Sequence, residues 1–178
     1  MKVEKAGIAG TVVREFLSAA ECAELIELGE ASGFRAAGVR TSGGQVAMPS
    51  VRNNSRTVCE APAWVALLWE RLSGLPLSEL AGQRACGLPK ELRFYRYEPG
   101  ERFKMHKDGP WRERGLTSQV TALLYLNAGF TGGDTVFRDA VVTPESGMLL
   151  LFPHATWHEG AVVETGVKYV LRSDILYS

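Results

Sequence analysis

The apolar residues of this chain follow two different patterns, one in each half. In the first half they recur every three to four residues, the period of an amphipathic helix. One such segment starts with Ser18 and Glu21, the pair of a capping box, and should end near Gly33. A second starts at Pro62, a residue favoured in the first turn of a helix. We expect both segments to form helices that cover a sheet, with apolar faces made of Cys22, Leu25, Ile26 and Gly29 and of Val65, Leu68, Trp69 and Leu72.

From residue 92 onward the pattern changes to short apolar runs separated by turn residues such as Gly132, Gly133 and Asp134. These runs predict strands over residues 92–97, 102–106, 119–126, 135–137, 147–152, 156–163 and 167–176. Short strands at this spacing are typical of a sandwich or barrel. The run 148–152 is apolar on both faces, as expected for a strand that is covered on both sides.

Residues 38–56 lie between the two predicted helices, are rich in Gly, Ser and Asn, and predict a long loop. Long loops in compact domains are often functional. Within this one, Arg52 and Arg56 flank two asparagines, a composition that suits recognition of a carboxylate or a peptide backbone, although a solvated turn would also explain it. We expect one domain over 1–178, in which 1–90 give mostly helical support and the loop, and 91–178 form the β core.

Composition narrows the function classes. The chain has 178 residues, of which 46% are hydrophobic and 22% charged, so it is neither disordered nor built around membrane spans. Its 20 basic and 20 acidic residues cancel, which makes a nucleic-acid partner unexpected, although residues 84–114 hold nine basic and five acidic ones. Three cysteines without CxxC spacing and a start that lacks a signal-peptide pattern favour a cytoplasmic location.

The histidines are few and all lie in the strand-rich half. In an extended segment, residues two apart point to the same side, so His106 and Asp108 could bind one metal ion. A histidine from a distant strand would complete a set of two histidines and one carboxylate, which leaves positions open on Fe(II). That histidine could be His158 or His154. The bare His-x-Asp pattern is weak, since an exposed loop also produces it.

Lys168, Val170, Arg172 and Asp174 share one face of a predicted strand. This face could point to solvent, as in an amphipathic edge strand. Alternatively Lys168 could point inward, where a buried ammonium group would need an anionic partner.

Taken in order, these residues resemble the Fe(II)- and 2-oxoglutarate-dependent dioxygenases, specifically their prolyl 4-hydroxylase-like branch. The resemblance covers about half of the chain and rests on Arg96, Tyr97, Glu98, Pro99, Gly100, Phe103, His106, Asp108, Thr121, Tyr125, Leu126, Asn127, Gly132, Gly133, Asp134, Thr135, Pro144, Gly147, Phe152, His158, Gly166, Val167, Lys168 and Tyr169.

The resemblance implies a mainly β chain with supporting helices (α+β), built on a double-stranded β-helix of the jelly-roll or cupin-like type. It implies that His106, Asp108 and His158 are the catalytic metal ligands. Lys168 would hold the distal carboxylate of 2-oxoglutarate, helped by the hydroxyl of Tyr125. Two further residues would contribute to cosubstrate binding, Tyr97 along the pocket and Arg172 by sharing or replacing the contact of Lys168.

The implied activity is hydroxylation of an unactivated C–H bond with decarboxylation of 2-oxoglutarate to succinate and CO2. Fe(II), 2-oxoglutarate and O2 would be required, with ascorbate as support. The substrate could be a small molecule or a peptidyl group, and Trp111 and Trp157 could pack or line its pocket. A nucleic-acid demethylase of the same superfamily and a non-catalytic cupin-like metal-binding module are the alternatives.

Overall fold

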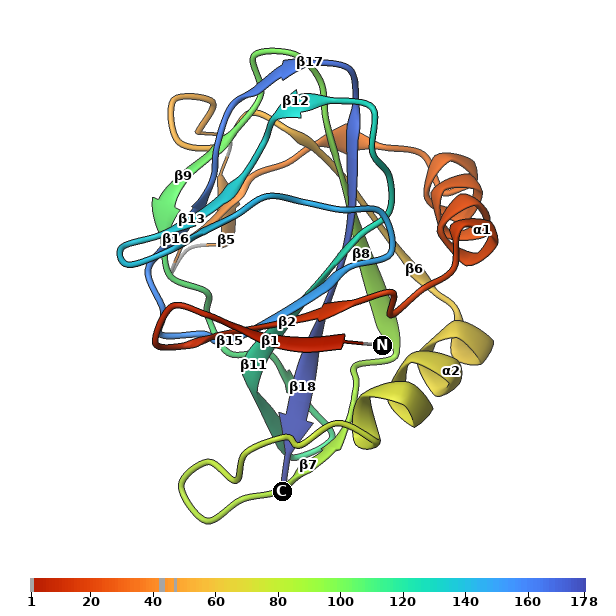
Figure 1. Cartoon of the computed structure of the whole chain (residues 1–178), viewed down its shortest axis with the longest axis vertical. Helices are drawn as coiled ribbons and strands as arrows, with labels where there is room; N and C mark the ends of the chain where they lie inside the picture. Colours follow the sequence, from red (N-terminus) through yellow and green to blue (C-terminus); the bar gives the residue numbers. More distant parts are fainter. Residues whose placement is uncertain (1, 42–43, 47) are drawn as a thin grey trace.

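The computed structural model describes residues 2–41, 44–46 and 48–178, and its strands form two facing sheets (Figure 1). The large sheet contains, in order, β1 (Lys2–Ala6), β2 (Gly10–Arg14), β15 (Leu149–Pro153), β11 (Leu116–Tyr125), β18 (Lys168–Tyr177), β8 (Glu91–Tyr97), β6 (Ser55–Glu60) and β3 (Arg35–Ala36). Two short strands join it, β10 (Arg112–Glu113) beside β11 and β7 (Ala85–Gly87) beside β18. The small sheet has the order β14 (Val141–Val142), β13 (Thr135–Phe137), β16 (His158–Gly160) and β9 (Phe103–His106).

Two further strand pairs lie outside these sheets, β12 (Thr131–Gly132) with β17 (Val163–Thr165) and β4 (Val39–Thr41) with β5 (Gly44–Val46). The named strand pairs are antiparallel, and strands far apart in sequence lie side by side, as β2 does with β15. This is the jelly-roll, or double-stranded β-helix, and it confirms the expected fold class.

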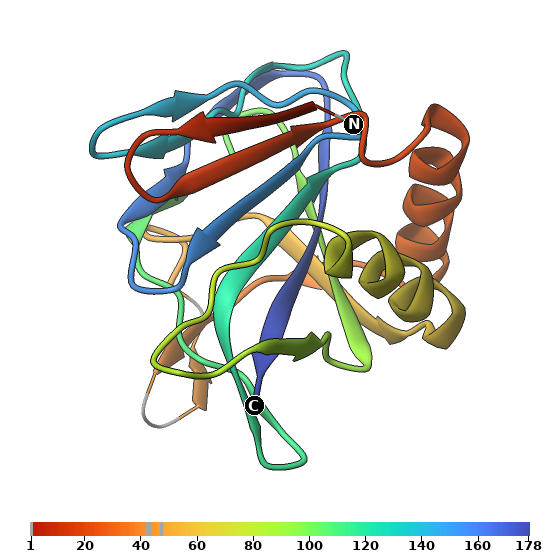
Figure 2. The same cartoon turned by 60° about the horizontal axis from the view of Figure 1, so that its bottom comes forward.

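The helices α1 (Ala19–Ala31) and α2 (Pro62–Ser73) lie on the side of the large sheet that faces away from the small sheet (Figures 1 and 2). The capping box is present, because the Ser18 hydroxyl accepts from the Glu21 amide and the Glu21 carboxylate accepts from the Ser18 amide. Leu25 and Leu68 are fully buried in the layer between the helices and the sheet. Both helices therefore start and pack as the sequence predicts. Neither is long and apolar enough to cross a membrane.

A second apolar layer fills the space between the two sheets. Strand β18 contributes to both layers, since Leu171 packs toward the helices and Val170 toward the interior. Lys168 and Arg172 share the face of Val170 and are only 3% and 8% exposed. The possibility of a solvent-facing edge strand is therefore wrong: β18 lies between β11 and β8, and both of its faces are covered.

The first 90 residues hold more strand than the sequence suggests. Strands β1, β2 and β6 extend the large sheet, so "mostly helical support" is a wrong description of this part. These strands are short and β1 is largely exposed, so their sequences lack a strong apolar alternation. Their pairing with β15 and β8 comes from distant parts of the chain.

Part of the predicted loop 38–56 forms the hairpin β4–β5, although its residues 42–43 and 47 lie outside the described chain. The predicted strand 156–163 is also different, because residues 161–162 separate β16 from β17.

Candidate active site

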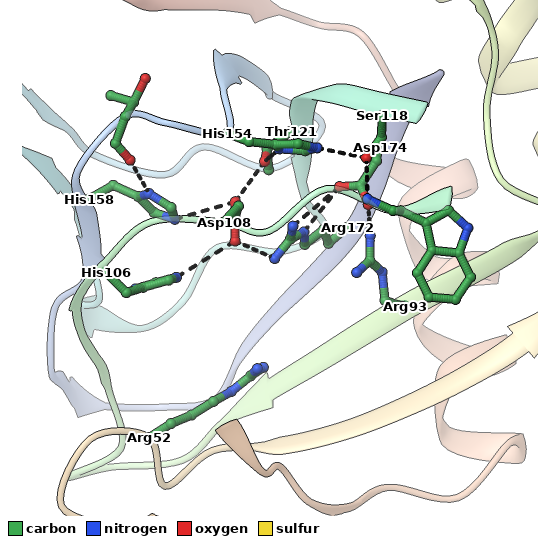
Figure 3. Close-up of polar contacts among 12 residues, drawn as sticks. Arg52, Arg93, His106, Asp108, Ser118, Thr121, His154, His158, Arg172 and Asp174 are labelled. Carbon is green, nitrogen blue, oxygen red and sulfur yellow. Dashed lines mark hydrogen bonds and ion pairs between the residues drawn. The ribbon is translucent and has the colours of Figure 1, made fainter. Parts of the chain in front are cut away.

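The two neighbouring strands β9 and β16 bring the first two candidate metal ligands together. His106 on β9 is the register partner of His158 on β16, and Asp108 follows β9 by two residues. The Asp108 carboxylate lies 3.8 Å from Nε2 of His106 and 3.7 Å from Nε2 of His158 (Figure 3). The three ligand atoms all lie within 4.8 Å of one another.

The second ring nitrogen of each histidine fixes which nitrogen is free for a metal. Nδ1 of His106 lies 2.7 Å from the carbonyl oxygen of Lys104, and Nδ1 of His158 lies 3.0 Å from that of Thr156. A carbonyl can only accept, so Nδ1 carries the proton in each ring and Nε2 is left as a ligand. The arrangement therefore fits a metal ion that takes two imidazoles and one carboxylate, such as Fe(II).

The protonation states also suit a metal. Burial, with the nearby His158, lowers the pKa of His106 to about 4, and burial also lowers the pKa of His158. Burial alone would raise the pKa of Asp108, but the charge of Arg172 and the hydroxyl of Thr121 help to hold it well below its usual range. At neutral pH the cluster offers two neutral imidazoles and one carboxylate.

Asp108 is held on both of its oxygens. Nη1 of Arg172 donates to Oδ1 at 2.6 Å, and the Thr121 hydroxyl donates to Oδ2 at 2.6 Å. Arg172 also donates to Asp174, which in turn pairs with Arg93. The result is a line of alternating charges, Asp108, Arg172, Asp174 and Arg93, that leads from the metal ligands into the large sheet (Figure 3).

His154 is connected to Asp108 through the hydroxyl of Thr121. It is buried and lies 2.8 Å from both the Thr121 and the Ser118 hydroxyls. Because Thr121 donates to Asp108, it must accept from Nδ1 of His154. Nε2 then accepts from Ser118, whose oxygen accepts from the Trp111 amide at 2.7 Å. His154 thus contacts Asp108 through Thr121 and does not lie among the three candidate ligands.

An inner pocket extends from the three candidate ligands into the jelly-roll and ends at a buried cation. Lys168 donates to the carbonyl of Gly133, and Tyr125 shares a hydrogen bond of 2.6 Å with Thr135. Burial lowers the pKa of Lys168 to about 7, against the opposing charge of Asp134. Tyr97, Tyr125, Thr135, Lys168 and Arg172 all line this pocket together with the candidate ligands.

An outer pocket with a volume of about 600 Å³ opens on two of the candidate ligands, His106 and Asp108. It is lined by Arg52, Arg56, Arg93, Lys107 and Trp111, among others, so the arginines of the predicted loop do reach the site. Trp157 is 37% exposed and lies near Lys107 and Arg138.

The structure thus brings the candidate metal ligands and the candidate cosubstrate residues together at one site, whereas Trp157 lines neither pocket. It also gives Arg172 different partners. Its guanidinium group is bonded to Asp108 and Asp174. Thr121, Thr135 and Tyr95 also lie at the site, although the sequence alone assigns them no role. Thr121 and Thr135 belong to the residues of the family pattern, and Asp174 shares the face of Lys168, which are the signals that the sequence offers.

Comparisons with known proteins show what this chain is similar to. A model of the 2OG-Fe(II) oxygenase superfamily matches residues 92–173. A PKHD-type hydroxylase of Klebsiella pneumoniae is 30% identical over 117 residues, which cover 57% of this chain and 52% of the relative. This chain therefore spans about half the length of that curated relative.

Two solved structures share the fold. The prolyl hydroxylase of Trichoplax adhaerens, in complex with a hypoxia-inducible-factor peptide fragment, superposes with a TM-score of 0.70 at 18% identity, covering 94% of this chain and 83% of that one. The viral collagen prolyl hydroxylase of Paramecium Bursaria Chlorella virus-1, in its 2OG complex, superposes with a TM-score of 0.65 at 20% identity. The superposition covers 96% of this chain and 97% of that one.

A jelly-roll with two histidines and one carboxylate at its mouth defines a class of non-haem iron proteins. Within that class, residues 92–173 are similar to the 2OG-Fe(II) oxygenase superfamily, and the chain also resembles a PKHD-type hydroxylase.

Proposed function

We propose that this chain is an Fe(II)- and 2-oxoglutarate-dependent oxygenase that hydroxylates an unactivated C–H bond. The observation that carries this proposal is one pocket with a candidate metal site at one end and a buried lysine, which forms no ion pair with any described residue, at the other. Such a pocket suits a dianion that reaches from the metal to an ammonium group. The iron and 2-oxoglutarate supply the oxidative chemistry when bound, and the protein supplies binding, orientation and shelter from water.

In this proposal His106, Asp108 and His158 hold Fe(II). Lys168 pairs with the distal carboxylate of 2-oxoglutarate, and the hydroxyl of Tyr125 donates to the same group. Because burial without an anion is costly for an ammonium group, a bound carboxylate would stabilise Lys168. Tyr97 lines the same pocket.

Arg172 takes another role in the proposal. Its guanidinium group already bonds two carboxylates, so it orients Asp108 instead of anchoring 2-oxoglutarate. This geometry supports the assignment of the anchor to Lys168.

The similarity to a PKHD-type hydroxylase supports a hydroxylase over a nucleic-acid demethylase. The substrate class in this proposal is a small molecule or a peptidyl group. A single domain over residues 1–178, support by ascorbate and a cytoplasmic location are further parts of the proposal that rest on the sequence and the family.

Succinate formation tests the proposal. The purified protein with Fe(II), O2, ascorbate and 2-oxoglutarate should form succinate slowly even without a primary substrate, because the open metal positions allow uncoupled turnover. The control is the Asp108→Ala variant under the same conditions. If the folded wild-type protein binds Fe(II) but forms no more succinate than this variant, the chain is a metal-binding module instead.

A further inference from the structure

Arg52 is a buried cation that the proposed reaction does not use. Its side chain is only 5% exposed, and its guanidinium carbon lies 4.4 Å from the centre of the Tyr95 ring and 4.5 Å from that of Phe103. Nε donates to the side-chain oxygen of Asn54 at 2.7 Å. Nη2 is buried and has no hydrogen-bond partner among the described residues.

No acidic side chain of the described residues forms an ion pair with Arg52, and its hydrogen-bonding neighbour Asn54 is neutral. A buried charge without a counter-ion is costly, and so is a buried N–H group without an acceptor. Both costs disappear when an anion binds at Nη2. In Figure 3 the side chain of Arg52 extends below His106 and Asp108, toward the space beside Arg172 and Arg93.

The outer pocket around Arg52 has more basic than acidic residues in its lining, although Arg93 and Arg172 pair with Asp174 and Asp108. The outer pocket is lined by five basic residues (Arg52, Arg56, Arg93, Lys107 and Arg172) and two acidic ones (Glu91 and Asp108). The Asp108 carboxylate already accepts from Arg172 and Thr121. A metal ion on the candidate ligands would add further positive charge.

The pKa of the buried Tyr95 phenol is shifted by the same positive charges. Burial alone would raise its pKa. The charges of Arg172, Arg52 and Arg93 overcome this effect and lower the pKa of Tyr95 to about 8.

The position of Arg52 separates its role from that of Lys168. Arg52 lines the outer pocket and Lys168 the inner one, and the two pockets share His106, Asp108 and Phe103. The Phe103 ring stacks on the His106 ring at 3.5 Å and also contacts the Arg52 guanidinium group. One aromatic ring therefore lies between Arg52 and a candidate metal ligand, and a group bound by Arg52 would lie close to the metal but outside the 2-oxoglutarate pocket.

We propose that the primary substrate carries a carboxylate and that Arg52 binds it in the outer pocket, where it places a nearby C–H bond at the metal. The guanidinium carbon of Arg52 lies over the Tyr95 and Phe103 rings, and Nη2 leaves N–H groups on one edge without a partner among the described residues. A planar carboxylate matches such an edge. This inference rests on the proposed oxygenase function and names its substrate class. A pocket of about 600 Å³ accepts a free amino acid as well as a short acidic peptide segment.

Binding of paired probes to protein loaded with Mn(II) and 2-oxoglutarate tests this inference without turnover. Each pair compares a carboxylate with its neutral amide: L-proline, L-lysine and L-leucine against their primary amides, and Ac-Ala-Pro-Asp-Ala-NH2 against its asparagine analogue. The paramagnetic relaxation of the probe protons measures binding near the metal. At least one carboxylate should bind about tenfold or more tightly than its amide, since a hydrogen bond to a charged group is lost in the amide. A preference in the amino-acid pairs identifies a free amino acid, and a preference in the peptide pair an acidic peptide.

Variants then assign the preference to Arg52. In Arg52→Gln the preference for the carboxylate should fall to less than threefold, and Arg52→Lys should restore part of it. Arg96→Gln is the matched control, because Arg96 also lies over an aromatic ring, at 5.1 Å from Phe34, but pairs with Glu30 away from the outer pocket. This control should keep the full preference.

The inference is overturned if no pair shows a preference in the wild-type protein, or if the preference persists in Arg52→Gln. The wild-type comparison of acid and amide needs no variant, so a poorly folded Arg52→Gln protein does not prevent the test. Failure of 2-oxoglutarate itself to bind would instead overturn the proposed function. The two failures are therefore distinguishable.

Discussion

The carboxylate of Asp108 receives two hydrogen bonds from the protein, one from Arg172 and one from Thr121. Groups that orient a metal ligand in this way typically contribute 10- to 100-fold to metal affinity. The Thr121→Val change keeps the shape of the side chain but removes its hydroxyl, and with it the bond that also connects His154 to Asp108. We therefore expect Thr121→Val to weaken Fe(II) or Mn(II) binding by roughly 10- to 100-fold in a calorimetric titration.

Thr57→Val is the control for this prediction. Thr57 is also buried, but its hydroxyl bonds to the carbonyl of Ser32, and neither residue lines the inner or the outer pocket. The Thr57→Val variant should lose about 1 kcal/mol in the free energy of unfolding, and its metal affinity should not change. Equal metal affinities of the two variants would show that Thr121 does not position Asp108.

Lys168 makes 2-oxoglutarate binding depend on pH. Burial lowers the pKa of the free lysine to about 7, whereas a bound carboxylate would raise it. Binding then takes up a proton above pH 7, so affinity should be constant below about pH 7 and fall by up to tenfold per pH unit above it. Burial raises the pKa of both Tyr97 and Tyr125, so neither phenol ionises in this pH range.

Titrations of 2-oxoglutarate at pH 6 to 9 into metal-loaded wild type and Lys168→Arg check this prediction. The arginine stays charged, so its curve should be flat. Tyr95→Phe is the second control, since Tyr95 also has a pKa of about 8 but is placed among the arginines. If Lys168→Arg keeps the wild-type dependence and Tyr95→Phe loses it, Lys168 is not the titrating anchor.

At the scale of elements, strand β18 carries both the core and the site. Its alternation places Leu171 and Ile175 against the helices and Lys168, Arg172 and Asp174 in the interior. The sequence predicts which residues share each face, because this follows from the two-residue period of a strand. It does not predict which face is buried, because that depends on β11, β8 and the small sheet, which pack on β18 from distant parts of the chain.

The charges on β18 predict a large effect of Arg172 on stability. Arg172→Met should destabilise the protein by about 3–5 kcal/mol, because it leaves Asp108 and Asp174 buried with fewer partners. Urea unfolding of the metal-free protein measures this. Arg84→Met is the matched control: its ion pair with Glu79 is exposed and should be worth about 0–1 kcal/mol. Equal small losses in both variants would contradict the account of a buried line of charges.

At the scale of the whole molecule, the sequence predicts the elements that depend on local signals better than those that depend on pairing between distant parts of the chain. The capping box at Ser18 and the proline at residue 62 mark the two helices because they act within one turn. The strands β2 and β6 are hard to predict because their partners β15 and β8 lie far along the chain, and β1 is weakly marked because it is largely exposed. The burial of Arg52 could not be read from the sequence either, since it depends on Tyr95 and Phe103.

The choice between His158 and His154 shows the same limit within the site. Both histidines are buried, and they lie four residues apart. The pairing of β16 with β9 places His158 opposite His106, whereas His154 lies against Thr121 and Ser118. Spacing within the family pattern favoured His158, but the hydrogen bonds of His154 required the three-dimensional structure.

His106, Asp108 and His158 are proposed to hold the metal. The most direct test is an anaerobic Fe(II) titration of wild type and of the variants His158→Ala and His154→Ala. Wild type should bind one Fe(II) per chain. His158→Ala should lose measurable binding, because a ligand atom is removed, whereas His154→Ala should bind at most about 100-fold more weakly, because its contact with Asp108 runs through Thr121. Loss of the metal in His154→Ala with near-normal binding in His158→Ala would contradict the assignment.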